Sequence, residues 1–217
     1  MAAPGSLQRI LFPWHRQGMT GDSLSDSELL AGLPRQPELM GTLYERHAVA
    51  VFRYLARRAG PPVAEDLLSE VFIAALSTSS RVVGHDSGSA LPWLYGIALN
   101  VLRRHFRQQQ AQGGATGDPG MDWDAVDDRL DAWAERGRLR AALAGLSDSD
   151  RELLLLVAWE GLTHAEAAAA LGISQVAARS RLHRARTRAS KALRQLQGSA
   201  PGDPDVVTTL YARKEAS

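Results

Sequence analysis

Hydrophobic residues recur along most of the chain at intervals of three and four, the spacing of amphipathic helices, and no stretch alternates like a half-buried strand. In the N-terminal half this pattern predicts four helices, at residues 25–34, 37–59, 63–77 and 92–110. Ser25 and Glu28 have the spacing of a capping box and mark the start of the first. A loop rich in Ser and Gly, residues 79–90, precedes the fourth. We therefore predict an all-α fold.

The composition changes at residues 111–135, where four glycines and one proline accompany seven acidic residues and a single arginine, a net charge of −6. A stretch with so much charge and so few apolar residues cannot build a core, so we predict a flexible linker. It separates two small helical domains, at residues 25–110 and 136–196. The ends of the chain are predicted to be flexible, as an N-terminal extension of residues 1–24 and a tail of residues 197–217.

The second domain contains the pattern of a helix-turn-helix. Around residues 153–159 we expect an apolar helix, followed by two shorter amphipathic helices. Thr163 and Glu166 form a second capping box. Gly172 supplies a tight turn, and Ser174 can cap the helix that follows. This order is typical of a DNA-binding motif, although a purely structural helical hairpin has the same pattern.

Charge favours DNA binding over the structural hairpin. At 100° per residue, Ala178, Leu182 and Ala185 share one side of the second helix and are predicted to be buried. Between Gly172 and Gln195 the chain has seven basic residues and no acidic one, and a polyanion relieves the repulsion within such a cluster. The residues on the opposite side are predicted to contact duplex DNA: Arg179, Ser180, His183, Arg184 and Thr187. An incidental surface position explains His183 equally well.

The helix at residues 92–110 offers a second candidate surface for nucleic acid. Its predicted buried stripe consists of Leu94, Ile97, Ala98, Val101 and His105. The opposite side combines an aromatic ring, an amide and arginines, which is typical of surfaces that bind a single strand: Trp93, Asn100, Arg103, Arg104 and Arg107. Packing of Trp93 against a neighbouring helix is the simpler alternative. The arginines are harder to explain that way, because their helix contains no acidic residue.

The helix at residues 63–77 has a different character. Its predicted core face consists of Leu67, Leu68, Val71, Phe72 and Ala75. Its outward side is predicted to carry Asp66, Ser69, Glu70 and Ile73. An acidic edge with an exposed isoleucine favours a protein partner over DNA. A solvated face with one stray apolar residue is the alternative, and spacing alone favours it.

Composition excludes several functional classes. The chain has no cysteine, which excludes disulfides, thiolate nucleophiles and cysteine-ligated zinc. Its six histidines lack metal-ligand spacing, and we find neither a phosphate-binding glycine loop nor a nucleophile motif, so we expect no enzyme, metal or cofactor. No apolar run is long enough to span a membrane, and we expect a soluble cytoplasmic protein. The net charge of +1 argues by itself against nucleic acid, but it sums a basic helix and an acidic linker.

Four segments, in order, resemble the conserved regions of bacterial RNA polymerase sigma factors, and the two-domain layout resembles the extracytoplasmic-function (ECF) group: residues 64–72, 92–100, 146–160 and 161–186. The resemblance implies a non-catalytic specificity subunit that binds core RNA polymerase, recognises promoter DNA and helps to open it. It also suggests an anti-sigma factor as a partner, although the sequence leaves open whether one exists. Four ordered motifs are far more specific than a lone helix-turn-helix.

The resemblance further implies roles for the candidate residues. The polymerase clamp would be bound by the helix that carries Asp66, Leu67, Glu70 and Phe72, to which we add the exposed Ile73. Trp93, Asn100 and the arginines after it would bind the unwound minus-ten strand, with the loop at residues 79–90 holding a flipped base. The basic helix would bind the minus-thirty-five duplex, and the acidic linker would thread the RNA path of the polymerase.

Two alternatives remain at this point. A stand-alone helix-turn-helix regulator would need a dimerisation surface and would leave the clamp-type helix unexplained. A sigma-like protein that binds the polymerase without directing initiation is the other.

Overall fold

The computed structural model describes residues 23–79, 88–112 and 133–197. Across these ranges the chain forms helices and turns and no strand, which confirms the predicted all-α fold. The chain divides into two compact units, Met1–Pro119 and Gly120–Ser217. The predicted N-terminal extension, linker and tail lie largely outside the described residues, as does most of the loop at residues 79–90.

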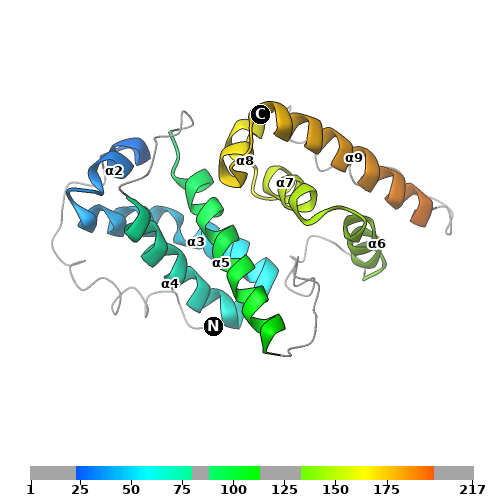
Figure 1. Ribbon diagram of the computed structural model, residues 1–217, viewed down its shortest axis with the longest axis horizontal. Coiled ribbons are helices and arrows are strands. Elements are labelled where there is room, and N and C mark those ends of the chain that lie inside the picture. The colour runs from blue at the N-terminus through cyan, green and yellow to red at the C-terminus, as the bar shows by residue number, and fades with distance from the viewer. Residues whose placement is uncertain (1–22, 80–87, 113–132, 198–217) are drawn as a thin grey trace. The chain divides into compact units, whose positions relative to one another are not determined.

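The described residues of the first unit form three long helices, preceded by a short one (Figure 1). Its elements are α2 (Asp26–Gly32), the 3₁₀ helix η1 (Pro37–Leu39), α3 (Met40–Ala59), α4 (Pro61–Thr78) and α5 (Leu91–Ala111). Helices α3, α4 and α5 pack against one another in every pairing, and α2 packs against α3. Each helix predicted in this half is present, although the one predicted at residues 37–59 is divided between η1 and α3.

Local sequence explains where these helices begin. The predicted capping box is formed, since the Ser25 hydroxyl accepts a hydrogen bond from the Glu28 amide at 3.3 Å and the Glu28 carboxylate accepts one from the Ser25 amide at 2.7 Å. Both α4 and α5 have proline in their first turn, where a backbone N–H is not needed. Gly60 separates α3 from α4 with a φ of 80°, a conformation that favours glycine.

The core of the first unit lies between its three long helices. The predicted core face of α4 is buried as expected, at Leu67, Leu68, Val71, Phe72 and Ala75. The ring of Phe72 meets that of Tyr44 in α3 edge to face, with 4.7 Å between centroids. Tyr54 in α3 lies 5.0 Å, centroid to centroid, from Tyr95 in α5. Aromatic contacts therefore connect α3 to α4 and to α5.

The stripe predicted for α5 is partly wrong. Three of its five positions are buried, but Ile97 and His105 are only half-buried. Positions outside the stripe are buried as well, namely Pro92, Tyr95, Leu99 and Leu102. The reason is that α5 packs against both α3 and α4, so its covered surface is wider than a stripe that faces one neighbour.

In the second unit, residues 133–197 form four helices: α6 (Trp133–Ala144), α7 (Asp148–Ala158), α8 (His164–Leu171) and α9 (Gln175–Gln197). Helix α9 packs against the other three, and α7 also contacts α8. Helix α6 is not predicted as a separate helix by the sequence pattern, and α9, predicted to be short, is 23 residues long. The buried positions of α9 are mostly alanines, as at Ala185 and Ala189, and such small residues give a weak hydrophobic pattern.

Arg151 of α7 is a buried polar residue that contacts backbone carbonyls at the end of α6. Its Nε donates a hydrogen bond to the Leu143 carbonyl at 3.2 Å, and its Nη2 lies 3.5 Å from the Leu146 carbonyl. Leu143 lies in the last turn of α6 and Leu146 follows that helix, in a region where carbonyls lack helical partners. The guanidinium group therefore stabilises the C-terminal end of α6.

Replacing Arg151 by alanine is expected to lower the free energy of unfolding of the second unit by about 1–3 kcal/mol, because it removes charged donors from buried carbonyls. Urea denaturation followed by circular dichroism measures the change. Arg140→Ala, at an exposed position of α6, is the matched control and should change stability by less than about 0.5 kcal/mol. Equal losses in the two variants would contradict the role assigned to Arg151.

Candidate nucleic-acid and partner-binding surfaces

The turn between α8 and α9 has the geometry of a helix-turn-helix. Thr163 caps α8, since its hydroxyl accepts a hydrogen bond from the Glu166 amide at 3.2 Å and the Glu166 carboxylate accepts one from the Thr163 amide at 2.7 Å. Gly172 follows α8 in the left-handed conformation, with φ 65° and ψ 32°. The Ser174 hydroxyl then accepts a hydrogen bond from the Ala177 amide at 3.2 Å. Both predicted caps and the predicted glycine turn are present.

Small residues allow α8 and α9 to pack closely. In α8, Ala167 and Ala168 are buried. In α9, the predicted stripe of Ala178, Leu182 and Ala185 is at most 2% exposed. This packing turns the opposite side of α9 outward.

The outward side of α9 is strongly basic. All five residues predicted to contact duplex DNA are exposed, and we call them the recognition face: Arg179, Ser180, His183, Arg184 and Thr187. The hydroxyl of Thr187 donates a hydrogen bond to the His183 carbonyl at 2.9 Å, which leaves its lone pairs as acceptors. Across its length α9 carries seven basic residues and no carboxylate. Such a surface suits the phosphates and base edges of a major groove, although the contacts of each residue stay a prediction.

The outward side of α5 carries the residues predicted to bind a single strand. We call them the strand-binding face: Trp93, Asn100, Arg103, Arg104 and Arg107. Trp93 is half-buried in the first turn of α5, so part of its ring is covered and part is accessible. The other four are exposed. The structure therefore places an aromatic ring, an amide and three guanidinium groups on one helix, a combination typical of single-strand binding surfaces.

An ion pair that the sequence analysis missed connects α5 to α4. Arg104 of the strand-binding face donates from Nη2 to the Oε2 of Glu70. Their side chains are 51% and 48% exposed, and an exposed pair of this kind contributes at most about 1 kcal/mol. A phosphate could therefore replace Glu70 as the partner of Arg104 at small cost. The two residues are 34 positions apart, so no spacing within one helix indicates the pair.

The residues predicted to bind the polymerase divide into two groups. Asp66, Glu70 and Ile73 are exposed, and Ile73 has 57% of its surface accessible, so these three define the outer face of α4. Leu67 and Phe72 are only 3% and 1% exposed. Their side chains belong to the core, which corrects the prediction that they touch a partner. Both side chains pack α4 into the core of the first unit.

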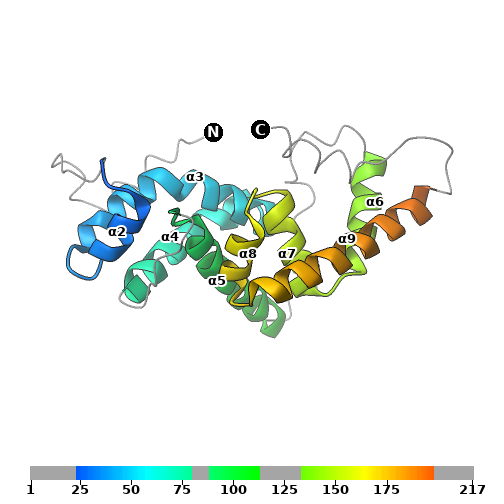
Figure 2. The same ribbon diagram turned by 90° about the horizontal axis from the view of Figure 1, so that it is seen from above.

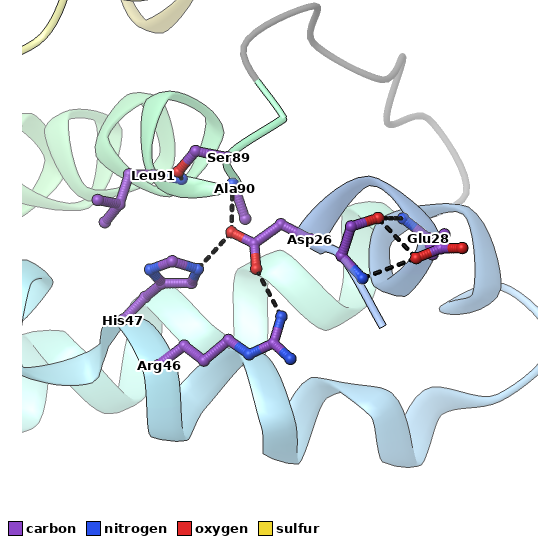
Figure 3. A network of polar contacts seen from close by, with 8 residues as sticks. Asp26, Glu28, Arg46, His47, Ser89, Ala90 and Leu91 are labelled. Carbon is purple, nitrogen blue, oxygen red and sulfur yellow. Dashed lines mark hydrogen bonds and ion pairs between the residues drawn. The ribbon is translucent and has the colours of Figure 1, made fainter. Parts of the chain in front are cut away.

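Asp26, which the sequence analysis did not single out, occupies the centre of a buried polar network (Figure 3). Its carboxylate accepts hydrogen bonds from Arg46 Nη1 at 3.0 Å, from His47 Nε2 at 2.6 Å and from the Ala90 amide at 2.8 Å. We call these four residues the Asp26 network. Ala90 lies 64 positions along the chain, so a local pattern could not have indicated this contact.

The network keeps Asp26 ionised. Burial by itself raises the pKa of Asp26, but the Ala90 hydrogen bond, the charge of His47 and the hydrogen bonds from Arg46 and His47 outweigh burial and lower the pKa below its ordinary value. A lowered pKa in the folded state stabilises the fold above the ordinary value. That contribution is lost as the pH falls through the lowered pKa.

Among the residues that the structure describes, no three or more His, Asp or Glu side chains are grouped as a metal site would require. No helix within those same ranges is both long and apolar enough to cross a membrane.

Comparisons with known proteins relate both units to one family. The family model for Sigma-70 region 2 matches residues 43–112, and the model for Sigma-70, region 4 matches residues 136–188. The chain is 30% identical over 148 residues to the ECF RNA polymerase sigma factor SigL of Mycobacterium tuberculosis, which covers 67% of this chain and 83% of SigL. It is 30% identical over 189 residues to the RNA polymerase sigma factor NccH of Alcaligenes xylosoxydans xylosoxydans, covering 82% of this chain and 100% of NccH.

A solved structure agrees with this assignment. CnrH in complex with the cytosolic domain of CnrY matches with a TM-score of 0.53 and 27% identity, covering 78% of this chain and 97% of CnrH. The two family models match the chain in the order that the four sequence segments predict, with region 2 in the first unit and region 4 in the second. The chain belongs to the sigma-70 family and, within it, to the ECF group of RNA polymerase sigma factors.

Proposed function

We propose that this chain directs core RNA polymerase to its promoters by binding the minus-thirty-five duplex with α9 and the unwound minus-ten strand with α5. The observation that carries the proposal is the recognition face of α9, whose five residues are all exposed on a helix with seven basic residues and no acidic one. The chain would act as a non-catalytic subunit in the cytoplasm, where its polymerase transcribes.

The outer face of α4 is the surface proposed to bind the polymerase. It combines two carboxylates, on Asp66 and Glu70, with the exposed Ile73. An exposed large apolar side chain beside charged groups is typical of a protein contact and has no use in a DNA contact of this kind. The predicted linker, with its net charge of −6, would occupy the RNA path of the polymerase.

An anti-sigma factor is a further proposed partner. CnrH, to which this chain is similar, was solved in complex with the cytosolic domain of CnrY. A protein bound to this chain would compete with the polymerase if it covered the outer face of α4.

Run-off transcription tests the proposed function. The purified chain, mixed with core polymerase, is expected to yield transcripts of defined length from a cognate promoter in a promoter library, whereas core polymerase alone yields none. Because both surfaces are required, scrambling either the minus-ten or the minus-thirty-five element should abolish the transcript. Absence of transcripts with every member of the library would contradict the proposal.

Duplex binding without polymerase separates the proposal from the alternative, a stand-alone helix-turn-helix regulator. A regulator would bind its site tightly and specifically as a free protein. The sigma-70 region 2 match at residues 43–112 has no place in such a regulator and disfavours it. Tight specific binding by the free chain, with no polymerase association, would reverse this preference.

A further inference from the structure

The N-terminal end of α5 is stabilised by a side chain from another helix, α2. Ala90 precedes the first residue of α5 and has no side-chain cap, and its backbone N–H donates instead to Asp26 in α2. The next amide, of Leu91, donates to the Ser89 hydroxyl at 3.2 Å. A carboxylate at a helix N-terminus is also favoured by the helix dipole. Asp26 therefore caps α5 from a helix that lies more than sixty residues earlier.

The carboxylate of Asp26 is itself held firmly in place. The capping box of Ser25 and Glu28 fixes the first turn of α2, in which Asp26 is the first residue. Two donors of α3, the Arg46 guanidinium group and the His47 ring, also hydrogen-bond to the carboxylate (Figure 3). The network thus joins α2, α3 and α5 through the side chain of Asp26, a residue with only 8% of its surface exposed.

The Asp26 network contacts α5 at its N-terminal end, close to Trp93. The apolar contacts of Leu94, Tyr95 and later residues secure the body of α5 in the core. The network acts on the end beyond them, at Ala90, which lies three positions before Trp93. Trp93 is the one aromatic member of the strand-binding face, and stacking on a base demands a fixed ring position.

We infer that Asp26 is a positioning residue for capture of the minus-ten strand: by holding the Ala90 amide it fixes the first turn of α5 and, through that turn, the ring of Trp93. Asp26 does not touch the DNA. It acts only through the backbone of α5, and the inference rests on the proposed function of the strand-binding face.

A double-variant cycle tests this inference. Holoenzyme is assembled from core polymerase and the full chain, and its affinity for a fluorescein-labelled single-stranded oligonucleotide with the non-template minus-ten sequence is measured by anisotropy. Asp26→Asn keeps the size of the side chain but removes its charge. We expect about tenfold weaker binding, a partial loss of the stacking that one aromatic side chain contributes. In a Trp93→Ala background, Asp26→Asn should cause no further loss.

Two controls separate positioning from stability. Val51→Ala shortens a buried residue of α3 outside the network and lowers stability without altering the start of α5, so its oligonucleotide affinity should stay at the wild-type value. The affinity of Asp26→Asn holoenzyme for a minus-thirty-five duplex should also be unchanged, because α9 belongs to the other unit. If Asp26→Asn does not fold, Arg46→Gln removes one donor and should give a smaller loss of the same kind.

The outcomes are distinguishable. If wild-type holoenzyme does not bind the oligonucleotide, the proposed function of α5 fails, and this inference fails with it. If Trp93→Ala weakens binding but Asp26→Asn does not, only the positioning role of Asp26 is overturned. Additive losses in the double variant, or an equal loss in Val51→Ala, would also overturn it, because both indicate a general loss of stability.

Discussion

Replacing Phe72 by alanine is expected to lower the free energy of unfolding of the first unit by about 3–5 kcal/mol, whereas Ile73→Ala should change it by less than about 0.5 kcal/mol. The two residues are neighbours in α4, but Phe72 is 1% exposed and Ile73 is 57% exposed. Phe72 also loses its edge-to-face contact with Tyr44. Since a domain is stable by only about 5–15 kcal/mol, the Phe72 variant will be close to unfolding.

Urea denaturation of both variants, with Phe72→Leu as a milder form, measures these losses. The affinity of the Ile73→Ala variant for core polymerase is measured as well. Ile73→Ala should weaken polymerase binding while its stability stays intact, because Ile73 is the apolar member of the outer face of α4. Normal polymerase affinity in Ile73→Ala would return that face to the simpler interpretation of a solvated surface. A small stability loss in Phe72→Ala would contradict the core position of its ring.

The second large effect is expected from the recognition face of α9. Replacing Arg179 and Arg184 together by alanine should remove about 2–6 kcal/mol of discrimination between the cognate minus-thirty-five element and a scrambled one, if each arginine makes a base contact worth about 1–3 kcal/mol. Competition binding of holoenzyme to the two duplexes measures the difference.

Arg188→Ala is the matched control, because Arg188 is exposed on the same helix but outside the recognition face. We expect Arg188 to contact a DNA phosphate, and such a contact carries no sequence information. The variant should therefore weaken binding to both duplexes equally and reduce the slope of log affinity against log salt concentration by about one. Unchanged discrimination in the double variant would show that Arg179 and Arg184 contact only the DNA backbone or no DNA at all.

Features determined by a few adjacent residues could be predicted from the sequence. The two capping boxes, at Ser25 and Thr163, and the turn at Gly172 depend on hydrogen bonds and backbone angles within four residues. The exposed recognition face of α9 follows in the same way from the period of one helix. For this reason the helix-turn-helix and its outward residues were predictable in detail.

Features that depend on contacts between distant segments could not be predicted. The Asp26 network and the pair of Glu70 with Arg104 join residues on different helices, and a single sequence contains no signal for either. The width of the buried surface of α5 depends on its second neighbour, and α6 is recognisable only through its packing on α9. Leu67 was assigned both to the core and to a partner contact, and only its 3% exposure separates the two.

The length of α9 limits how much DNA one helix can contact. Its 23 residues extend over about 34 Å, as far as one full turn of B-form DNA. A straight rod cannot follow a groove that circles the duplex once in that distance, so bases are within reach of only its first few turns. The remainder of α9 is the part that α6 crosses (Figure 2). A footprint of a few base pairs is too short to mark a unique address in a genome. If α5 and α9 each bind one short element, as proposed, a promoter of this protein is defined by both elements, and their separation counts as much as their sequences.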